Sequence, residues 1–534
     1  MARHILLRTW KGVSSPLPCS SYFVEQADMA SRTQIVSTHK PQTAGLAHFM
    51  ARALKERARA AKKLDAGAVH DLRVALRRCR TMADALATFD PDKSFPAMRK
   101  ASKRTFRSLG KLRDTQVMRE WVKKLAPAGD QLAACLLESL AQSEGAAKAE
   151  AATALEAFDT RKWRRWSREL AERSRRVPPD SLVYQHLALA RCLEVREAHR
   201  FTTRSRSRVS WHRLRIALKR FRYTVENFLP RHHEEWIADL KLLQDLLGDV
   251  HDLDVLRAEF RRILRPVESG ADESSGAAPN EAEQWYARID ALRKERLSAY
   301  RAKMSGSNPI WNVWLAGLPH GPRLEEAVLA TLSTWAAYRD PNFDHSRKVT
   351  ALALELFDGF GAHSLNPIFR DAESRTILQA AALLHDVGRA KKDAGHHKRS
   401  FRMISELAPP VGWSEDEIFA AALIARYHRG AEPRLEQKEY AALEPAEQGR
   451  VAWLAATLRL ADGLDSDHRG RIQNVSVQRD RTALTIRAVG YVHDVDSAAM
   501  LARKKHLLET LCDCPVVIQP AETRLAARVA SMAS

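Results

Sequence analysis

The stretch VHDLRVALRRCR at residues 69–80 recurs in altered form as WHRLRIALKRFR at residues 211–222. When the two histidines are aligned, each cation of the first stretch falls on a cation of the second. A helix turns about 100° per residue, so in each copy the histidine and three cations share one stripe. The opposite side of each copy is apolar, with Leu72, Leu76, Cys79, Ala83 and Leu86 matched by Leu214, Leu218, Phe221, Val225 and Phe228. We therefore predict two helices with an apolar back and a cationic front.

The cationic front carries no acidic residue between its cations. A helix that needed only solubility would mix Glu with Lys and gain favourable pairs one turn apart. Arginine presents a planar fork of donors that suits phosphate oxygens, and histidine can donate at mildly acidic pH. An ordinary solvated basic face is the alternative for a single helix, but two copies in register favour an anion-binding surface.

Composition agrees with an anionic partner, because the 534 residues carry a formal net charge of +21. Nucleic acid, an acidic membrane surface and a phosphate polymer are the candidates. Aromatic residues make up only 7% of the chain, and no aromatic-rich strand is suited to stacking bases. No apolar run approaches the length of a membrane span. Six scattered cysteines without a C-x-x-C pair indicate reduced thiols, so we expect a cytoplasmic protein.

A second block also recurs, as LGKLRDTQVM at residues 109–118 and LGDVHDLDVL at residues 247–256. Two blocks repeated in the same order indicate a duplication of several helices and a pseudo-twofold domain. We predict mainly helical structure over residues 46–305, in repeats at about 46–172 and 181–305. Residues 1–45 lack periodicity and are expected to be a disordered tail, or an extension upstream of a start at Met29.

The C-terminal part is expected to be helical and then mixed. Residues 306–322 contain SGSNP and GLPHGP and are predicted to be a linker, followed by helices over 323–470. Alternating residues predict strands at 471–478 and 481–489, then a helix at about 496–511 and a strand at Val516–Ile518. These would form a small α+β cap over 471–520, with a tail at 521–534. The predicted fold class is thus mainly α with a small C-terminal α+β cap.

Histidine and aspartate residues suggest a metal site in this part. His385 and Asp386 close an apolar helix at 377–388, although the His-Asp dipeptide itself occurs four times. His345 begins the helical stretch 344–358, and Asp462 lies within an otherwise apolar helix at 456–470. Three helices can thus bring two imidazoles and two carboxylates to one divalent ion. Mixed N and O donors suit Mn²⁺, Fe²⁺ or Mg²⁺, which can polarise a phosphoryl oxygen and activate water.

Further histidines and cations follow in AGHHKRS and ARYHRG. They are candidates for a second metal or for holding phosphate, and ordinary helix-cap or surface histidines are the alternative. The residues concerned are His396, His397, Lys398, His428 and Arg429.

The first region resembles the conserved-histidine α-helical domain, known as CHAD, over roughly residues 45–305. The resemblance rests on the two H-x-x-R-x-x-x-[RK]-R-x-R stretches and the two LG-x-x-[RH]-D blocks. It implies two four-helix halves that bind inorganic polyphosphate in a basic cavity. The residues carried over by position are His70, Arg73, Arg77, Arg78, Arg80, His212, Arg215, Lys219, Arg220 and Arg222. Lys103, Arg107 and Lys111 are added from their own helical spacing.

The region 323–520 resembles the C-terminal HD domain of the exopolyphosphatase/guanosine pentaphosphatase family. The matching pieces are LLHDVG, GHHKRS, ARYHRG, LRLADGLD and the final strand–helix–strand. The chain is too short, and too helical before residue 323, to hold that family's actin-like catalytic domain. The resemblance implies an HD metal site of the kind that cleaves phosphate esters or anhydrides.

Our first hypothesis is therefore a cytoplasmic polyphosphate-binding protein, associated with polyphosphate granules, whose HD phosphohydrolase acts on polyphosphate or a phosphorylated nucleotide. The alternative is a non-catalytic targeting module whose HD domain is structural or dimerises, so a homodimer is left open. Nucleic-acid binding is a third hypothesis, but sequence-specific binding is disfavoured because no groove-reading motif is present. No membrane partner is expected. The expected cofactor is Mn²⁺, Mg²⁺ or Fe²⁺, and the expected catalytic residues are His345, His385, Asp386, Asp462 and His428.

Overall fold

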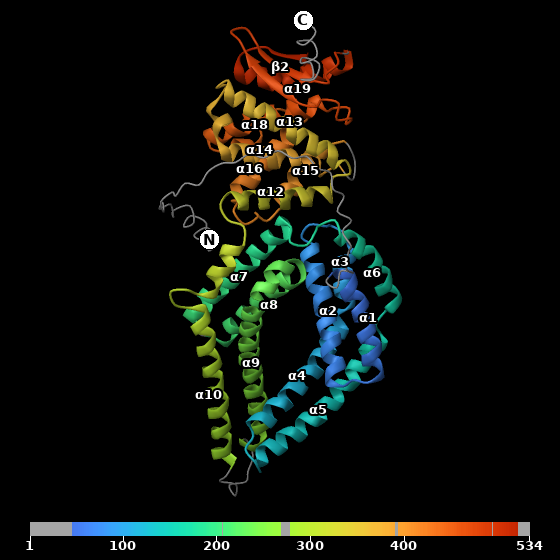
Figure 1. Ribbon diagram of the computed structural model, residues 1–534, viewed down its shortest axis with the longest axis vertical. Helices are drawn as coiled ribbons and strands as arrows, with labels where there is room; N and C mark the ends of the chain where they lie inside the picture. Colours follow the sequence, from blue (N-terminus) through green and yellow to red (C-terminus); the bar gives the residue numbers. More distant parts are fainter. Residues whose placement is uncertain (1–44, 206, 269–277, 390–393, 494, 522–534) are drawn as a thin grey trace, which may run out of the picture. The chain divides into compact units, whose positions relative to one another are not determined.

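The computed structural model describes residues 45–205, 207–268, 278–389, 394–493 and 495–521. The predicted tails at 1–45 and 521–534 lie almost entirely outside the described residues. Helices dominate, and the described strands form one small sheet near the C-terminus, so the predicted fold class is confirmed (Figure 1). None of the described helices is both long enough and apolar enough to cross a membrane.

Among the described residues, the N-terminal half contains ten helices. Their bounds are α1 (Leu46–Lys62), α2 (Ala66–Leu86), α3 (Ser94–Ala101), α4 (Lys103–Leu125), α5 (Gln131–Glu156), α6 (Thr160–Ser174), α7 (Leu182–Ser205), α8 (Arg208–Phe228), α9 (Pro230–Glu268) and α10 (Ala278–Met304).

The two repeated stretches form α2 and α8, as predicted. Each begins at a side-chain cap: Asp65 accepts from the Ala68 amide at 2.8 Å, and Ser207 accepts from the Ser210 amide at 3.1 Å. The predicted apolar backs are buried in both helices. Burying one large aliphatic or aromatic side chain contributes roughly 1.5–3 kcal/mol, so these backs fix which face remains for the cations.

Among the described residues, two of the places where the repeats meet are prominent. The first is between α2 and α8, where Arg78 forms an ion pair with Glu226. The second is a separate apolar cluster that includes Trp121 from α4 and Trp285 from α10. The Trp285 indole also donates to Asp130 at 2.8 Å. Contacts at both places join the two repeats of the duplication.

The segment predicted as a linker contains a helix of its own, α11 (Ile310–Gly317). Its sequence IWNVWLAG places Trp314 in the core, with its ring centroid 5.1 Å from that of Phe221. The Gly and Pro residues on either side interrupt the helical pattern of the sequence. The apolar octapeptide between them nevertheless forms a short helix, because it can bury apolar side chains such as Trp314 in the core.

The C-terminal part begins with a series of helices. Their bounds are α12 (Pro322–Ala337), α13 (Phe343–Ala362), the 3₁₀ helix η1 (Pro367–Arg370), α14 (Ala372–Leu384), α15 (His396–Ser405), α16 (Glu415–Tyr427), α17 (Lys438–Ala441) and α18 (Pro445–Leu464).

A three-stranded sheet and one helix complete the chain as an α+β unit. Strands β1 (Val475–Arg479) and β2 (Leu484–Val489) are antiparallel, while β3 (Val516–Ala521) pairs parallel to β2. A parallel pair needs a crossover, which is α19 (Val495–Cys512), packed on α18. The predicted strands, helix and order are present, although both hairpin strands begin a few residues later than predicted.

Candidate functional site

Four cations gather where α2 meets α8, and we call them the seam cations. They are Arg73 and Arg77 from α2 and Arg215 and Lys219 from α8. Arg73 donates to the carbonyl of Phe106 at 3.3 Å, and the Arg77 guanidinium lies 4.9 Å from the centre of the Tyr223 ring. The buried Nε atoms of Arg77 and Arg215 have no hydrogen-bond partner among the described residues. Buried donors normally have partners, so these atoms point to an anionic ligand.

The seam carries more positive charge than its acids balance. Burial, followed by the charges of Arg215 and Arg77, lowers the pKa of Lys219 to about 7. Burial raises the pKa of Asp252 to about 6, despite the opposing effect of Arg215 and Lys219. Burial also raises the pKa of Asp114. An anion entering the seam would therefore relieve repulsion between the cations.

Other predicted phosphate-binding residues have protein partners. Arg78 pairs with Glu226 and also lies 4.5 Å from the centre of the Phe49 ring. Arg80 donates to the Arg99 carbonyl at 2.6 Å and to Ser102 Oγ at 3.2 Å. These two arginines therefore link α2 to neighbouring parts of the structure.

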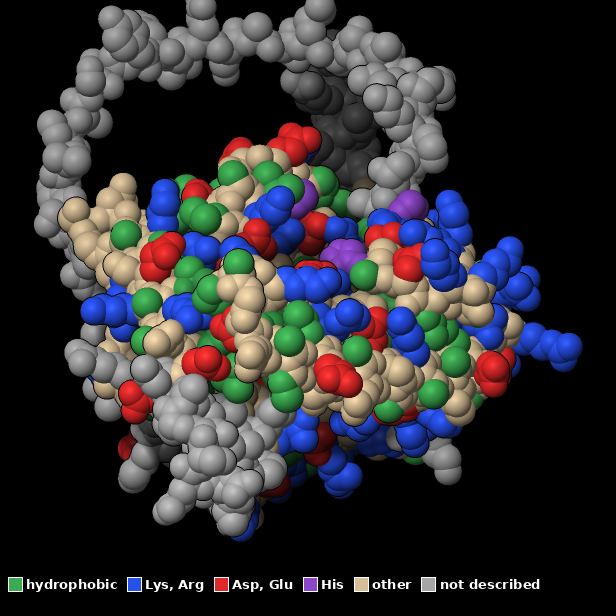
Figure 2. All heavy atoms as spheres, turned by 90° about the horizontal axis from the view of Figure 1, so that it is seen from below, with side chains coloured by type: hydrophobic (Ala, Val, Ile, Leu, Met, Phe, Trp, Pro, Cys, Tyr) green, Lys and Arg blue, Asp and Glu red, His purple; other side chains and the backbone are tan. Residues whose placement is uncertain are grey.

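The remaining predicted residues lie around the seam. Arg222 is half-buried and its Nε has no hydrogen-bond partner among the described residues. Lys111 forms an ion pair with Glu150 at 2.9 Å on the surface of α4. The other exposed members of the predicted set are His70, Lys103, Arg107, His212 and Arg220. Figure 2 shows many Lys and Arg side chains spread over the face seen from below, interspersed with Asp and Glu side chains.

The second repeated block packs beside the seam. A Cβ on Gly110 would lie 2.7 Å from the Arg73 guanidinium, so the glycine lets α4 approach that arginine closely. The block also carries Asp114, whose charge acts on Arg73, and in the other repeat Asp252, whose charge acts on Arg215. The duplicated sequence block contains both aspartates, but its pattern predicts no role for them. Nothing in the sequence pattern predicted the contact of Tyr223 with Arg77.

The C-terminal centre is built first from two equivalent helix ends. His385 follows the last residue of α14, and His428 follows the last residue of α16. Each Nδ1 lies within hydrogen-bond distance of the carbonyl three residues earlier, at 2.7 Å for Ala382 and 2.6 Å for Ala425. A neutral ring that donates from Nδ1 presents Nε2 as an acceptor. Both rings are thus oriented with Nε2 toward the interior.

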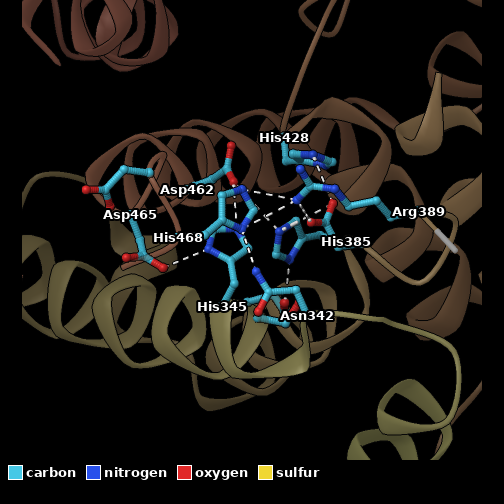
Figure 3. Close-up of polar contacts among 12 residues, drawn as sticks. Asn342, His345, His385, Arg389, His428, Asp462, Asp465 and His468 are labelled. Atoms are coloured by element: carbon cyan, nitrogen blue, oxygen red, sulfur yellow. Dashed lines mark hydrogen bonds and ion pairs between the residues drawn. The ribbon is translucent and has the colours of Figure 1, made fainter. Parts of the chain in front are cut away.

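His345, near the start of α13, is oriented by a carboxylate that the sequence analysis missed. Its Nδ1 lies 2.7 Å from Asp465 Oδ2, and its Nε2 lies 3.3 Å from Asp462 Oδ1 (Figure 3). Burial lowers the pKa of His345, but hydrogen bonds with Asp462 and Asp465 outweigh it and raise the pKa to about 9. In the absence of a cation, the imidazolium therefore balances these carboxylates.

Asp386 joins two groups of possible metal ligands. One group is His345, His385 and Asp386, and the other is Asp386, His396 and His428, with ligand atoms within 4.8 Å of one another in each group. Asp386 Oδ1 lies 3.7, 3.1 and 3.8 Å from the Nε2 atoms of His385, His396 and His428. Burial raises the pKa of Asp386, but the surrounding histidines outweigh it and lower it well below its usual range. We call these groups the two triads.

Asp462 lies beside the first triad. Its Oδ1 is 3.8 Å from His385 Nε2, and its Oδ2 forms an ion pair with Lys504 from α19. The four predicted metal ligands are thus brought together. Of the histidines proposed for a second metal, His396 and His428 belong to a triad, whereas the neighbouring His397 belongs to neither.

A cavity of about 620 Å³ opens beside the triads and is rich in cations. Arg389 contacts Asp386 Oδ2 at 3.1 Å, and its guanidinium lies 3.1 Å from Nε2 of His468. The His468 ring in turn lies 3.8 Å, centre to centre, from that of His345. Arg429, proposed from the sequence, also lines this cavity, whereas Lys398 does not. The basic lining of this cavity, beside the carboxylates and imidazoles of the triads, suits an anionic ligand.

The fold and the two sites define a mainly α-helical chain of two modules. One module has the cationic seam, and the other has the buried His/Asp centre. Residues 44–261 match the family model of the CHAD domain, and residues 331–500 match that of the Ppx/GppA phosphatase domain III. The chain therefore joins a CHAD domain to a domain of the Ppx/GppA type, a combination that suggests a polyphosphate-related function. The predicted resemblances are confirmed, over shorter ranges than 45–305 and 323–520.

Comparison with solved structures found the crystal structure of the CHAD domain from the plant Ricinus communis. The two sequences are 22% identical, and the similarity covers 48% of this chain and 88% of that chain, with a TM-score of 0.37. A search of curated proteins found no match to the chain.

Proposed function

We propose that the N-terminal module binds inorganic polyphosphate through the seam cations and that the C-terminal domain is a divalent-metal-dependent phosphohydrolase. The main support for the phosphohydrolase is that Asp386 belongs to both triads of possible metal ligands. The binding part is supported by unpartnered arginine nitrogens and by the excess positive charge at the seam. The substrate would be polyphosphate itself or a phosphorylated nucleotide.

The donor set fits a divalent cation. His385 Nε2 is buried and has no hydrogen-bond partner among the described residues, although its Nδ1 is firmly held. Imidazole nitrogens with carboxylate oxygens suit Mn²⁺, Fe²⁺ or Mg²⁺, and second ring nitrogens held by carbonyls or carboxylates are typical of metal-binding histidines. When bound, such an ion supplies Lewis acidity to a phosphoryl oxygen and to water.

The protein's own residues would bind and orient the substrate at this centre. Arg389 and Arg429 line the cavity and provide donors for phosphate oxygens. Asp465 fixes the orientation of His345, and His468 packs against that ring and contacts Arg389. These contacts would hold the scissile phosphate close to the triads and limit its orientations.

A non-catalytic targeting module is the second candidate. It is favoured by the kind of match found, because the Ppx/GppA model that matches residues 331–500 is the model of domain III. In that case a metal at the triads would stabilise the domain without turnover.

Phosphate release separates the two candidates. We expect purified protein with Mn²⁺ or Mg²⁺ to release orthophosphate from polyphosphate, guanosine tetraphosphate or a nucleoside triphosphate, and a chelator to abolish the release. The measurement is orthophosphate formed over time from each substrate, with and without the metal. No release from any substrate by protein that contains stoichiometric metal would favour the targeting module.

Polyphosphate binding should weaken as the pH rises above 7. Lys219 has a pKa of about 7, and a bound polyanion favours its charged form, so binding takes up a proton. Deprotonation of Asp252, with a pKa of about 6, acts in the same direction. We expect affinity for long-chain polyphosphate to fall by up to about tenfold per pH unit from pH 7 to 8.5, measured by titration calorimetry at constant ionic strength.

The control for this pH dependence is Lys219→Arg, because arginine stays charged throughout that range. Its affinity should change much less between pH 7 and 8.5. An equally steep decrease in this variant would contradict the assignment to Lys219.

A further inference from the structure

Lys504 reaches the His/Asp centre from α19, the helix of the C-terminal α+β unit. Its side chain is buried, with 8% of the residue exposed. Its Nζ forms an ion pair with Asp462 Oδ2 and donates to the carbonyl of His428 at 2.9 Å. A buried ammonium is costly unless it is paired, so its position has to be stabilised by the neighbouring helices.

The packing of α19 on α18 is adapted to this lysine. A Cβ on Gly463 would lie 3.0 Å from both Cβ and Cγ of Lys504. Glycine therefore lets the lysine stem pass close to α18, next to Asp462. The close approach is a second observation, independent of charge, that the lysine is placed at this centre by the fold.

Two features leave Lys504 able to contact a ligand. An ammonium has three donors, and the hydrogen bonds given above use two of them, one to Asp462 and one to His428. Lys504 also lines the 620 Å³ cavity, together with its neighbour Arg503. Asp462 meanwhile keeps Oδ1 toward His345 and His385 while Oδ2 faces the lysine.

We infer that Lys504 is a substrate-binding residue that donates its third hydrogen to a phosphate oxygen beside the triads. The inference rests on the proposed function for the location of the phosphate. If Lys504 binds the substrate, the C-terminal α+β unit is part of the site, because α19 of that unit supplies the lysine. The competing role is purely electrostatic, in which Lys504 only balances Asp462 until a metal binds.

Orthophosphate binding to metal-loaded protein distinguishes these roles. We expect Lys504→Met to keep the wild-type metal content, while its Kd for orthophosphate rises about tenfold or more, as expected for loss of a charged hydrogen bond. Lys504→Arg keeps the charge and should recover part of the affinity. Lys505→Met is the matched control, because Lys505 instead pairs with Glu509 at 2.8 Å and donates to the carbonyl of Val516; its Kd should match the wild type.

An unchanged orthophosphate Kd in metal-loaded Lys504→Met would overturn the inference, and so would loss of metal from that variant. If the methionine variant does not fold, Lys504→Gln, which keeps a donor amide, is judged by the same criteria. If the wild-type protein binds no metal, that result would instead contradict the proposed function. Lys504 would then be judged by the orthophosphate Kd of metal-free protein, where equal values for wild type and variant overturn the inference.

Discussion

Asp386→Ala should abolish metal binding and reduce phosphate release by at least about a thousandfold. Asp386 is the one ligand shared by both triads, so its removal leaves each triad with two imidazoles. Its Oδ1 also lies within 3.8 Å of the Nε2 atoms of three histidines. Asp386 is the carboxylate residue of both triads. The measurements are elemental analysis and phosphate release on one preparation.

The same variant should lose the metal-dependent rise in melting temperature. Metal that binds only the folded state stabilises it by about 2.7 kcal/mol at a hundred times its Kd. Polyphosphate binding by the N-terminal module should stay unchanged, which shows that this module has folded. Asp358→Ala is a matched control, because Asp358 pairs with Arg375 at 2.8 Å on the surface and lies outside the triads.

Two outcomes would change the interpretation. Stoichiometric metal in Asp386→Ala would show that the ligand assignment is wrong. Loss of metal from the variant, together with a wild type that hydrolyses none of the tested substrates, would favour the non-catalytic targeting module.

The sequence predicted the N-terminal helices well because two kinds of signal agreed. Helical periodicity assigned the apolar and charged faces of α2, and the duplication repeated the assignment in α8. The apolar faces are buried in both. Periodicity cannot show which cations on a face meet acids from other helices, however. Arg78 faces Glu226, whereas Arg77 faces the ring of Tyr223, and neither partner is near in sequence.

The C-terminal centre was predicted in part for a similar reason. Helix ends and interrupted apolar runs marked His385, Asp386 and Asp462, which the structure brings together. The sequence could not separate His396 from His397, because only the start of α15 determines which ring faces Asp386. Lys504 was missed because its role depends on the packing of α19 on α18, which leaves no local pattern.

The combined variant Arg73→Glu/Arg215→Glu should weaken polyphosphate binding by about 100-fold to 10,000-fold. It removes one cation from each half of the seam, and each lost hydrogen bond to a charged group is worth about 1.5–3 kcal/mol. Two carboxylates would also repel the polymer. Fewer cations facing a polyanion should make the dependence of affinity on salt shallower, by analogy with phosphate-backbone binding.

The fold should tolerate this double reversal. In the wild type the seam cations repel one another, and the new carboxylates would give Arg77 and Lys219 oppositely charged neighbours. The same carboxylates would also face Asp114 and Asp252, whose charges act on Arg73 and Arg215 in the wild type, so we expect a melting temperature close to that of the wild type. It is measured on the same preparation, so that lost binding cannot be attributed to unfolding.

The matched control is Arg161→Glu/Arg164→Glu, which reverses two exposed arginines on α6. Both double variants have the same net charge, so any difference between them comes from position. A small loss in the control and a large loss in the seam variant would locate the polymer at α2 and α8. Equal losses, measured by titration across several salt concentrations, would mean that polyphosphate binds to the general positive charge of the surface, and the seam would then not be the binding site.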